Sequence, residues 1–220
     1  MMTSPVVLLH GLARNGASMY SLARYLRDAG FETLVVSYPS RRDPLSSLAS
    51  TVSSEIHANF PKVDRFSFVT HSMGGIVLRT MVADGLLQVQ RAVMLAPPNG
   101  GSEVVNALRR VPFVSRIMGP AFLQLSVGTD AEASWVSGLP SPDFELGVIA
   151  GRQWTPFFSP LLPGPGDGKV TVASTRIEGM SDHQVVRTGH TWIMGHRLVK
   201  ASIVAFLRNG SFGNAGRRAD

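Results

Sequence analysis

Short apolar runs alternate along the chain with longer stretches in which apolar residues recur at helical spacing. Val6–Leu9 is a continuous apolar run, and residues 18–29 behind it have their apolar positions on one helical face. The alternation predicts further strands at residues 33–37, 66–70, 92–95, 146–150 and 184–187. It predicts further helices at residues 45–58, 73–84 and 192–207. Strands that alternate with helices favour the α/β class, with a mostly parallel sheet covered by helices on both faces.

One long stretch, residues 97–145, interrupts this alternation between two predicted strands. Ser102 is placed to cap a helix that runs to Arg110, and residues 113–125 are rich in apolar side chains. These side chains, Phe113 and Ile117 among them, are too many for an exposed loop, so we expect them to be buried. Connections of this length usually carry function, so we expect a small helical cap here. The chain is then a single domain over residues 1–208, with residues 97–145 as a cap-like insertion and residues 209–220 as a flexible tail.

Composition narrows the partners and the compartment. The chain has no Cys, which excludes disulfides and thiol chemistry, and it has no apolar run of about 18 residues that could span a bilayer. Its net charge is +6, but the Arg residues are scattered singly or in pairs. We therefore expect no nucleic-acid partner and no integral membrane segment, although the charge would allow weak association with an anionic membrane surface. Without a signal-like start, we expect a cytoplasmic protein.

The strongest chemical signal is the segment Thr70-His71-Ser72-Met73-Gly74-Gly75, which lies between a predicted strand and a predicted helix. A sharp turn of this kind exposes a serine Oγ at the edge of the sheet, and it needs small residues where strand and helix come close. The helix N-terminus also presents backbone N–H groups to a negative charge. Ser72 is therefore the candidate nucleophile, against the alternative of an ordinary helix-capping serine.

A second signal, His10-Gly11, follows the first strand directly. We expect Gly11 to permit a tight turn that aims the N–H of Leu12 into the site. Together with the N–H of Met73, it would form an oxyanion hole.

A third signal combines Asp167, which lies between two glycines, with His190 further along the chain. The order Ser72, Asp167, His190 is the order of nucleophile, acid and base in serine hydrolases of the α/β class. The competing acids are Asp143 and Asp182, and the competing bases are His183 and His196. Asp182 precedes a predicted strand, which puts it at the wrong end of the sheet, and His196 falls within a predicted helix.

These segments together resemble the α/β-hydrolase superfamily, in particular small bacterial lipases and esterases. The resemblance covers the whole chain and is carried by His10-Gly11-Leu12, by the segment from Thr70 to Gly75, by Asp167-Gly168-Lys169-Val170 and by His190. There are two departures. Thr70 stands where the serine turn usually has Gly, and His190 lacks the following Asp of calcium-dependent bacterial lipases, so we expect no metal site.

The resemblance implies a serine hydrolase that cleaves carboxylic esters of short to medium acyl chains through an acyl-serine intermediate, with no cofactor. We expect Met118 and Phe122, from the apolar part of residues 97–145, to line the acyl site. The substrate would be a small-molecule or lipid ester. The alternatives are a thioesterase or acyltransferase, and a catalytically silent α/β-hydrolase-fold binding protein.

Overall fold

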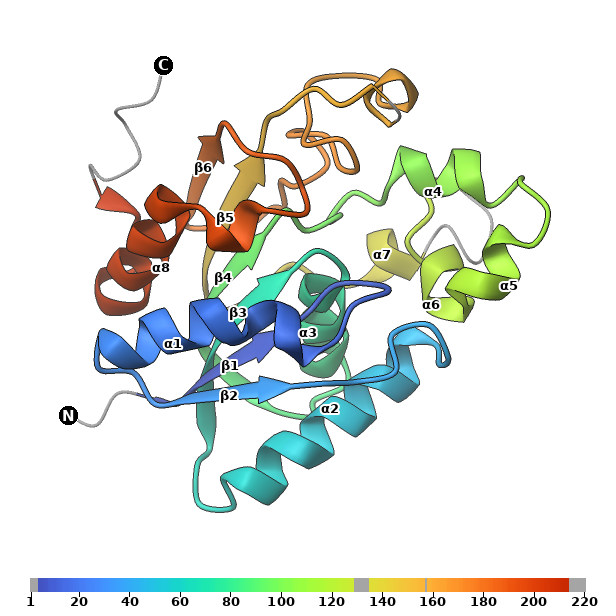
Figure 1. Cartoon of the computed structure of the whole chain (residues 1–220). Helices are drawn as coiled ribbons and strands as arrows, with labels where there is room; N and C mark the ends of the chain where they lie inside the picture. The colour runs from blue at the N-terminus through green and yellow to red at the C-terminus, as the bar shows by residue number, and fades with distance from the viewer. Residues whose placement is uncertain (1–3, 129–134, 157, 214–220) are drawn as a thin grey trace.

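A six-stranded parallel sheet forms the centre of the molecule (Figure 1). The computed structural model describes residues 4–128, 135–156 and 158–213. The strands run in the order β2-β1-β3-β4-β5-β6, and every neighbouring pair is parallel. They are β1 (Val6–Leu9), β2 (Thr33–Val36), β3 (Arg65–His71), β4 (Gln88–Leu95), β5 (Glu145–Gly151) and β6 (Asp182–Val186). The predicted parallel sheet is confirmed. β4 begins earlier than predicted because its polar first residues alternate between exposed and half-buried positions.

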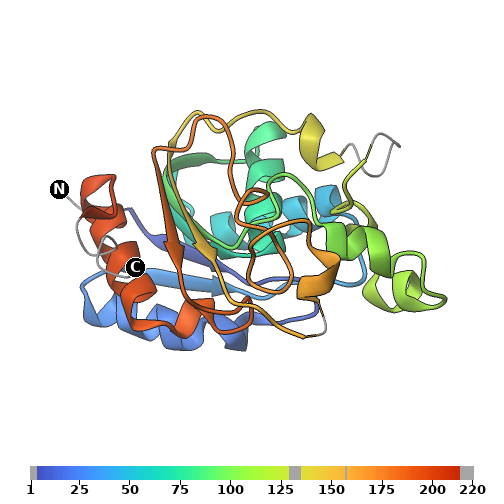
Figure 2. The same cartoon turned by 90° about the horizontal axis from the view of Figure 1, so that it is seen from above.

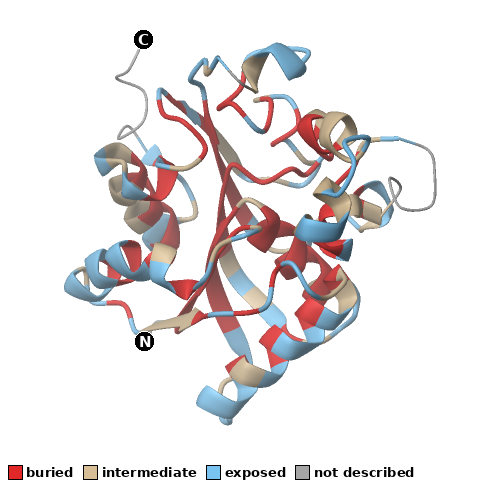
Figure 3. Ribbon diagram, turned by 45° about the vertical axis from the view of Figure 1, so that its right-hand side comes forward, coloured by how far each residue is buried: buried red, intermediate tan, exposed pale blue. Residues whose placement is uncertain are grey.

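Two helices cover each face of the sheet (Figures 1 and 2). One face carries α1 (Tyr20–Asp28), preceded by η1 (Gly16–Met19), and α8 (Arg197–Asn209), while α2 (Leu45–Asn59) and α3 (Met73–Ala83) cover the other. Each face has its own cluster of buried apolar residues, and the buried strands separate the two (Figure 3).

The last helix differs from the prediction. Its first part is a separate turn, η3 (Ile193–Gly195), and α8 begins only after His196, which has an extended backbone with ψ of 130°. Gly195 is a weak helix former, so the helical pattern of residues 192–207 is interrupted at this point.

Residues 97–145 connect β4 to β5, and their described part extends beyond the carboxyl ends of the strands (Figure 1). Their described part contains four short helices, α4 (Glu103–Leu108), α5 (Val114–Met118), α6 (Pro120–Leu123) and α7 (Trp135–Gly138). A further turn, η2 (Ser159–Leu161), lies in the loop after β5. The predicted small set of helices is therefore present.

Not all the apolar side chains of this segment are buried, contrary to expectation. Phe122 and Leu125 are buried, but Phe113 is 71% exposed and Ile117 is 60% exposed. The helix α5 has five residues at the outer end of the segment, so only one side of it can contact the rest of the protein. The prediction that both side chains pack inside is wrong.

Arg79 of α3 anchors the two ends of this segment to the sheet. Its side chain is buried, and its guanidinium nitrogens donate to backbone carbonyl oxygens of Asn99, Val136, Leu139 and Pro140 at 2.9 to 3.5 Å. Burial lowers the pKa of Arg79 to about 10. Because carbonyl groups from both ends share one guanidinium, Arg79 holds the two ends of the segment together beside α3.

The expected flexible tail, residues 209–220, is packed at its start. Phe212 is buried, its ring centroid lies 5.1 Å from that of Phe206, and its N–H donates to Asp182 at 2.8 Å. Residues 214–220 lie outside the described residues, and the division into domain, insertion and tail stays a prediction. Within the described ranges, no helix has the length and apolar character needed to cross a bilayer.

Candidate active site

The sheet opens a crevice where the chain leaves β1 and β3. These strands are neighbours, yet β1 leads to α1 on one face and β3 leads to α3 on the other. The two connecting loops therefore diverge at the carboxyl ends of the strands, which is where open α/β sheets bind ligands. Leu12 follows β1 and Ser72 follows β3, so the topology brings both to this crevice.

Ser72 occupies a strained backbone conformation between the end of β3 and the start of α3. Its φ is 53° and its ψ is −126°, values that side-chain-bearing residues rarely adopt. Gly74 allows this turn, because a Cβ there would lie 2.8 Å from the carbonyl oxygens of Leu9 and His10. The expectation that the turn needs small residues for close packing of strand and helix therefore has a direct steric reason.

Thr70 fits the turn because Gly75 leaves space beside it. Thr70 is fully buried, and a Cβ on Gly75 would lie 3.3 Å from the Thr70 hydroxyl. The glycine at this position thus makes room for the unusual threonine.

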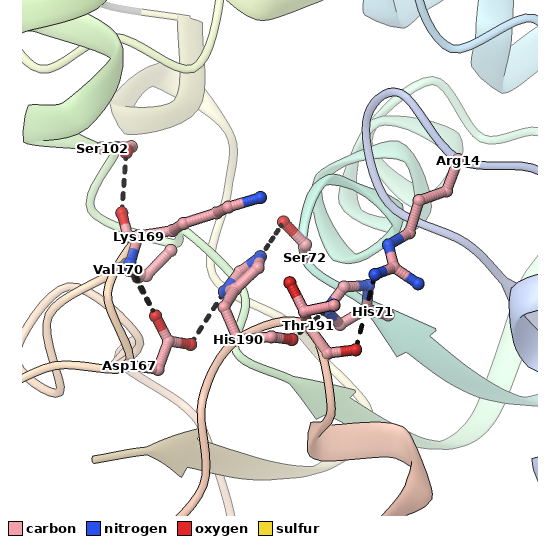
Figure 4. A network of polar contacts seen from close by, with 9 residues as sticks. All are labelled: Arg14, His71, Ser72, Ser102, Asp167, Lys169, Val170, His190 and Thr191. Carbon is pink, nitrogen blue, oxygen red and sulfur yellow. Dashed lines mark hydrogen bonds and ion pairs between the residues drawn. The ribbon is translucent and has the colours of Figure 1, made fainter. Parts of the chain in front are cut away.

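His190 connects Ser72 to Asp167 (Figure 4). The His190 Nε2 lies 3.0 Å from the Ser72 Oγ, and its Nδ1 lies 2.8 Å from the Asp167 Oδ2. His190 and Asp167 are 5% and 2% exposed. The three residues that the sequence analysis selected are therefore in one hydrogen-bonded chain, which ends at a serine in the cavity wall.

The loop around Asp167 fixes its carboxylate. The Oδ1 accepts backbone N–H bonds from Lys169 at 3.0 Å and from Val170 at 2.9 Å, and Gly168 adopts a φ of 98° that few other residues tolerate. The carbonyl oxygen of Asp167 also accepts the N–H of His190 at 3.0 Å. Asp167 thus holds His190 through both its side chain and its backbone.

The competing residues are not part of this hydrogen-bonded chain, and His196 lies between η3 and α8. Asp182 and His183 begin β6, and Asp143 precedes β5, so these three are at the opposite edge of the sheet from Ser72. Burial is the main cause that lowers the pKa of His183 to about 4. The His183 Nε2 lies 3.1 Å from the hydroxyl of Thr175.

His71 has a role that the sequence analysis missed. It is 1% exposed, and its Nε2 lies 3.0 Å from the carbonyl oxygen of His190. Burial, reinforced by the proximity of His190 and Arg14, holds the pKa of His71 well below its usual range. A neutral ring therefore donates Nε2–H to the backbone of His190 and positions that residue. The position of His71 directly before Ser72 was the only sign in the sequence that it lies at the site, and it did not indicate the contact with His190.

His10 positions the loop after β1 rather than facing the serine. Its Nδ1 lies 2.9 Å from the carbonyl oxygen of Gly11, and its Nε2 accepts the backbone N–H of Tyr38 at 3.2 Å. The rings of His10 and Tyr38 stack with centroids 4.1 Å apart. Burial is the main cause that lowers the pKa of His10 from its ordinary value.

Gly11 is needed for a different reason from the expected one. The residue with positive φ in this loop is Ala13, at 56°, and not Gly11. A Cβ on Gly11 would instead lie 3.0 Å from the Nδ1 of His71 and 3.1 Å from the Cβ of Ser72. Gly11 therefore allows the loop to approach the serine turn closely.

A cavity of about 200 Å³ opens beside Ser72. Leu12 lies in its wall, as do Met118 and Phe122, the two predicted substrate-binding residues. Residues 97–145 contribute further apolar side chains to the wall, namely Val104, Val105, Leu108 and Leu125. A larger hollow of about 770 Å³ lies around residues 163–165 and does not include Ser72. Over the described residues, no group of three or more His, Cys, Asp or Glu could hold a metal ion.

The fold and the serine turn define an α/β hydrolase. A family model described as the alpha/beta hydrolase family matches residues 6–200, so the chain belongs to this family.

Solved structures show the same fold at low sequence identity. The Bacillus licheniformis lipase BlEst2 in mature form has a TM-score of 0.70 and 18% identity, over 96% of this chain and 93% of that one. A thermophilic esterase from Thermogutta terrifontis has a TM-score of 0.66 and 15% identity, over 94% and 90%. Phospholipase PlaB from Legionella pneumophila has a TM-score of 0.71 and 18% identity over 98% of this chain, which spans 60% of that longer one. No curated protein sequence matches the chain.

Proposed function

We propose that this protein is a serine hydrolase that cleaves carboxylic esters through an acyl-serine intermediate. The observation that carries the proposal is the hydrogen-bonded chain from Ser72 Oγ through His190 to Asp167, with distances of 3.0 and 2.8 Å. Esterases and lipases among the structurally similar proteins support the same class.

Each of the three residues has a definite role in this mechanism. His190 takes the Ser72 proton as the oxygen attacks the ester carbonyl, and it later returns a proton to the leaving alcohol. Asp167 accepts the Nδ1–H of His190, which fixes the tautomer of the ring, and stabilises the imidazolium that forms. Water then attacks the acyl-serine with His190 again as the base.

Backbone N–H groups would stabilise the oxyanion of the tetrahedral intermediate. Met73 is the first residue of α3, where N–H groups have no partner within the helix and the helix dipole favours negative charge. Leu12 approaches from the loop after β1. The close approach at Gly11 supports this arrangement, because it brings that loop against the serine turn.

The apolar wall indicates the acyl part of the substrate. Met118 and Phe122 would contact the acyl chain, and each buried CH₂ adds about 0.8 kcal/mol of binding free energy. A cavity of about 200 Å³ limits this gain to short or medium chains.

The test combines a covalent probe with a substrate panel. A fluorophosphonate should label the wild-type protein and not Ser72→Ala, and Ser72→Ala should lower ester hydrolysis by about 10⁴-fold while remaining folded. The panel contains p-nitrophenyl esters of increasing chain length and acyl-CoA thioesters, each with and without an alcohol acceptor. If the protein prefers thioesters, or transfers the acyl group to the alcohol faster than it hydrolyses the ester, it is a thioesterase or an acyltransferase instead. A wild-type protein that is neither labelled nor active would be a silent binding protein.

A further inference from the structure

Two basic side chains lie in the wall of the cavity beside Ser72. Arg14 lies in the loop after β1, and Lys169 lies two residues after Asp167; both line the same cavity as Ser72. Figure 4 shows the Lys169 side chain extending toward Ser72 from one side, with the Arg14 guanidinium on the other side. The two side chains come from distant parts of the chain, so it is the fold that brings them together.

Neither cation forms an ion pair within the described part of the chain. The Lys169 ammonium forms no hydrogen bond or ion pair there, and Arg14 has one long bond of 3.5 Å to the carbonyl oxygen of Thr191. The described residues of the cavity wall include no Asp or Glu. The nearby carboxylate of Asp167 is already occupied by three hydrogen bonds, from His190 and two backbone N–H groups.

The two positive charges also oppose one another. Burial lowers the pKa of Lys169, the charge of Arg14 lowers it further, and Asp167 counteracts them in part. Like charges that share a hollow and lack a partner destabilise each other, and an anion between them would relieve this repulsion. The cavity thus combines apolar side chains from residues 97–145 with two cationic side chains near Ser72.

We propose that Arg14 and Lys169 bind an anionic group of the substrate, so that the preferred ester combines an apolar acyl chain with an alcohol part that carries a carboxylate or a phosphate. The acyl chain contacts the apolar wall, and the anionic alcohol part lies between the two cations. This inference rests on the proposed function, because it names the substrate class of the same site.

Matched esters test the anionic preference directly. In the phosphate pair, 1-butyrylglycerol 3-phosphate is compared with 1-butyrylglycerol. In the carboxylate pair, 3-(butyryloxy)propanoate is compared with 3-(butyryloxy)propanamide. For the preferred anion the wild-type protein should show a kcat/KM ratio, anionic over neutral, of about 100, because each of the two cations contributes about tenfold. The pair with the larger ratio identifies whether the anion is a phosphate or a carboxylate.

Charge variants assign the preference to the two residues. Lys169→Gln should lower the ratio by about tenfold, the effect of losing one charge-assisted hydrogen bond, and Arg14→Gln should lower it further. Lys169→Arg should retain most of it. Lys62→Gln, at an exposed lysine before β3, removes the same charge far from the cavity and should leave the ratio unchanged.

Two failures are distinguishable. If the wild-type protein hydrolyses both members of each pair equally well, or if Lys62→Gln lowers the ratio as much as Lys169→Gln, the anion site is wrong and ester hydrolysis stands. If the wild type hydrolyses none of the four esters and a fluorophosphonate does not label Ser72, the proposed function itself has failed.

Discussion

The two walls of the cavity are built in different ways. The wall at the strand ends holds buried polar groups, and Ser72, Asp167 and His190 are fixed there by hydrogen bonds to one another and to backbone groups. The wall from residues 97–145 is apolar, and its helices have four to six residues each within the described ranges. The first wall depends on the sheet, while the second depends on side-chain packing and on Arg79.

Under the proposed function, this difference separates the residues that carry out the reaction from those that select the substrate. Proton transfer needs heavy-atom distances near 3 Å, which only a rigid frame maintains, and the carboxyl ends of β3, β5 and β6, which precede Ser72, Asp167 and His190, provide that frame. An acyl chain needs only apolar contact and a suitable volume. Substitutions in the strand-end wall should therefore change the reaction rate, whereas substitutions in the apolar wall should change which ester is preferred.

The largest effect is expected at Asp167. Asp167→Asn should lower kcat for a p-nitrophenyl ester by up to about 10⁴-fold, because the amide would favour the wrong tautomer of His190. Steady-state kinetics measures the loss. Asp182→Asn is the matched control, since Asp182 lies at the other edge of the sheet and accepts a bond from Phe212. Equal losses in both variants would show that Asp167 is not the acid.

Acid should destabilise the strand-end wall. Burial lowers the pKa values of His10 and His71 in the folded protein, so below about pH 6.5 the unfolded chain binds protons that the folded protein does not. The free energy of unfolding should therefore fall as pH drops from 6.5, by up to about 1.4 kcal/mol per pH unit for each histidine. Residues 97–145 contain no histidine and add nothing to this effect.

Urea unfolding at pH 7, 6 and 5 measures this slope. His71→Gln places an amide N–H donor close to the position of the His71 Nε2, which contacts the carbonyl oxygen of His190, and it cannot be protonated in this range. Its free energy of unfolding should depend less steeply on pH than that of the wild type. An unchanged slope would mean that His71 is not the buried neutral group described above.

Removing Arg79 should loosen the connection between the two walls. Arg79→Met leaves buried carbonyl groups at Val136 and Leu139 without their donor, which should lower the free energy of unfolding by about 3 kcal/mol. Urea unfolding measures the change. Arg24→Met, on the exposed face of α1, should change it by no more than about 0.5 kcal/mol. Similar changes in the free energy of unfolding for the two variants would show that Arg79 does not anchor residues 97–145.

The strand-end wall could be predicted from the sequence much better than the apolar wall. Ser72 lies in a contiguous segment whose strand, small residues and helix all point to the same turn, and the order of Asp167 and His190 follows the chain. The contact of His71 with His190 joins residues 119 positions apart, so no local pattern could predict it. In the insertion, apolar composition predicted burial, but it could not show that Phe113 and Ile117 lie on the outer side of α5.

The smallest effect concerns acyl chain length, and neighbouring residues of α5 provide the comparison. Met118 lines the cavity, whereas Ile117 is 60% exposed and does not. Met118→Trp should fill space that the end of an acyl chain would occupy. If it excludes two CH₂ groups, the kcat/KM ratio of octanoyl to butyryl p-nitrophenyl esters should fall by about tenfold, since each buried CH₂ contributes about 0.8 kcal/mol. Ile117→Trp adds the same ring outside the cavity and should leave that ratio unchanged. Phe122→Ala should shift the preference the opposite way, because it enlarges the cavity that Met118→Trp reduces. If all three variants remain folded and keep the wild-type ratio, the acyl chain does not contact this wall, and selectivity for the acyl part must come from the strand-end side.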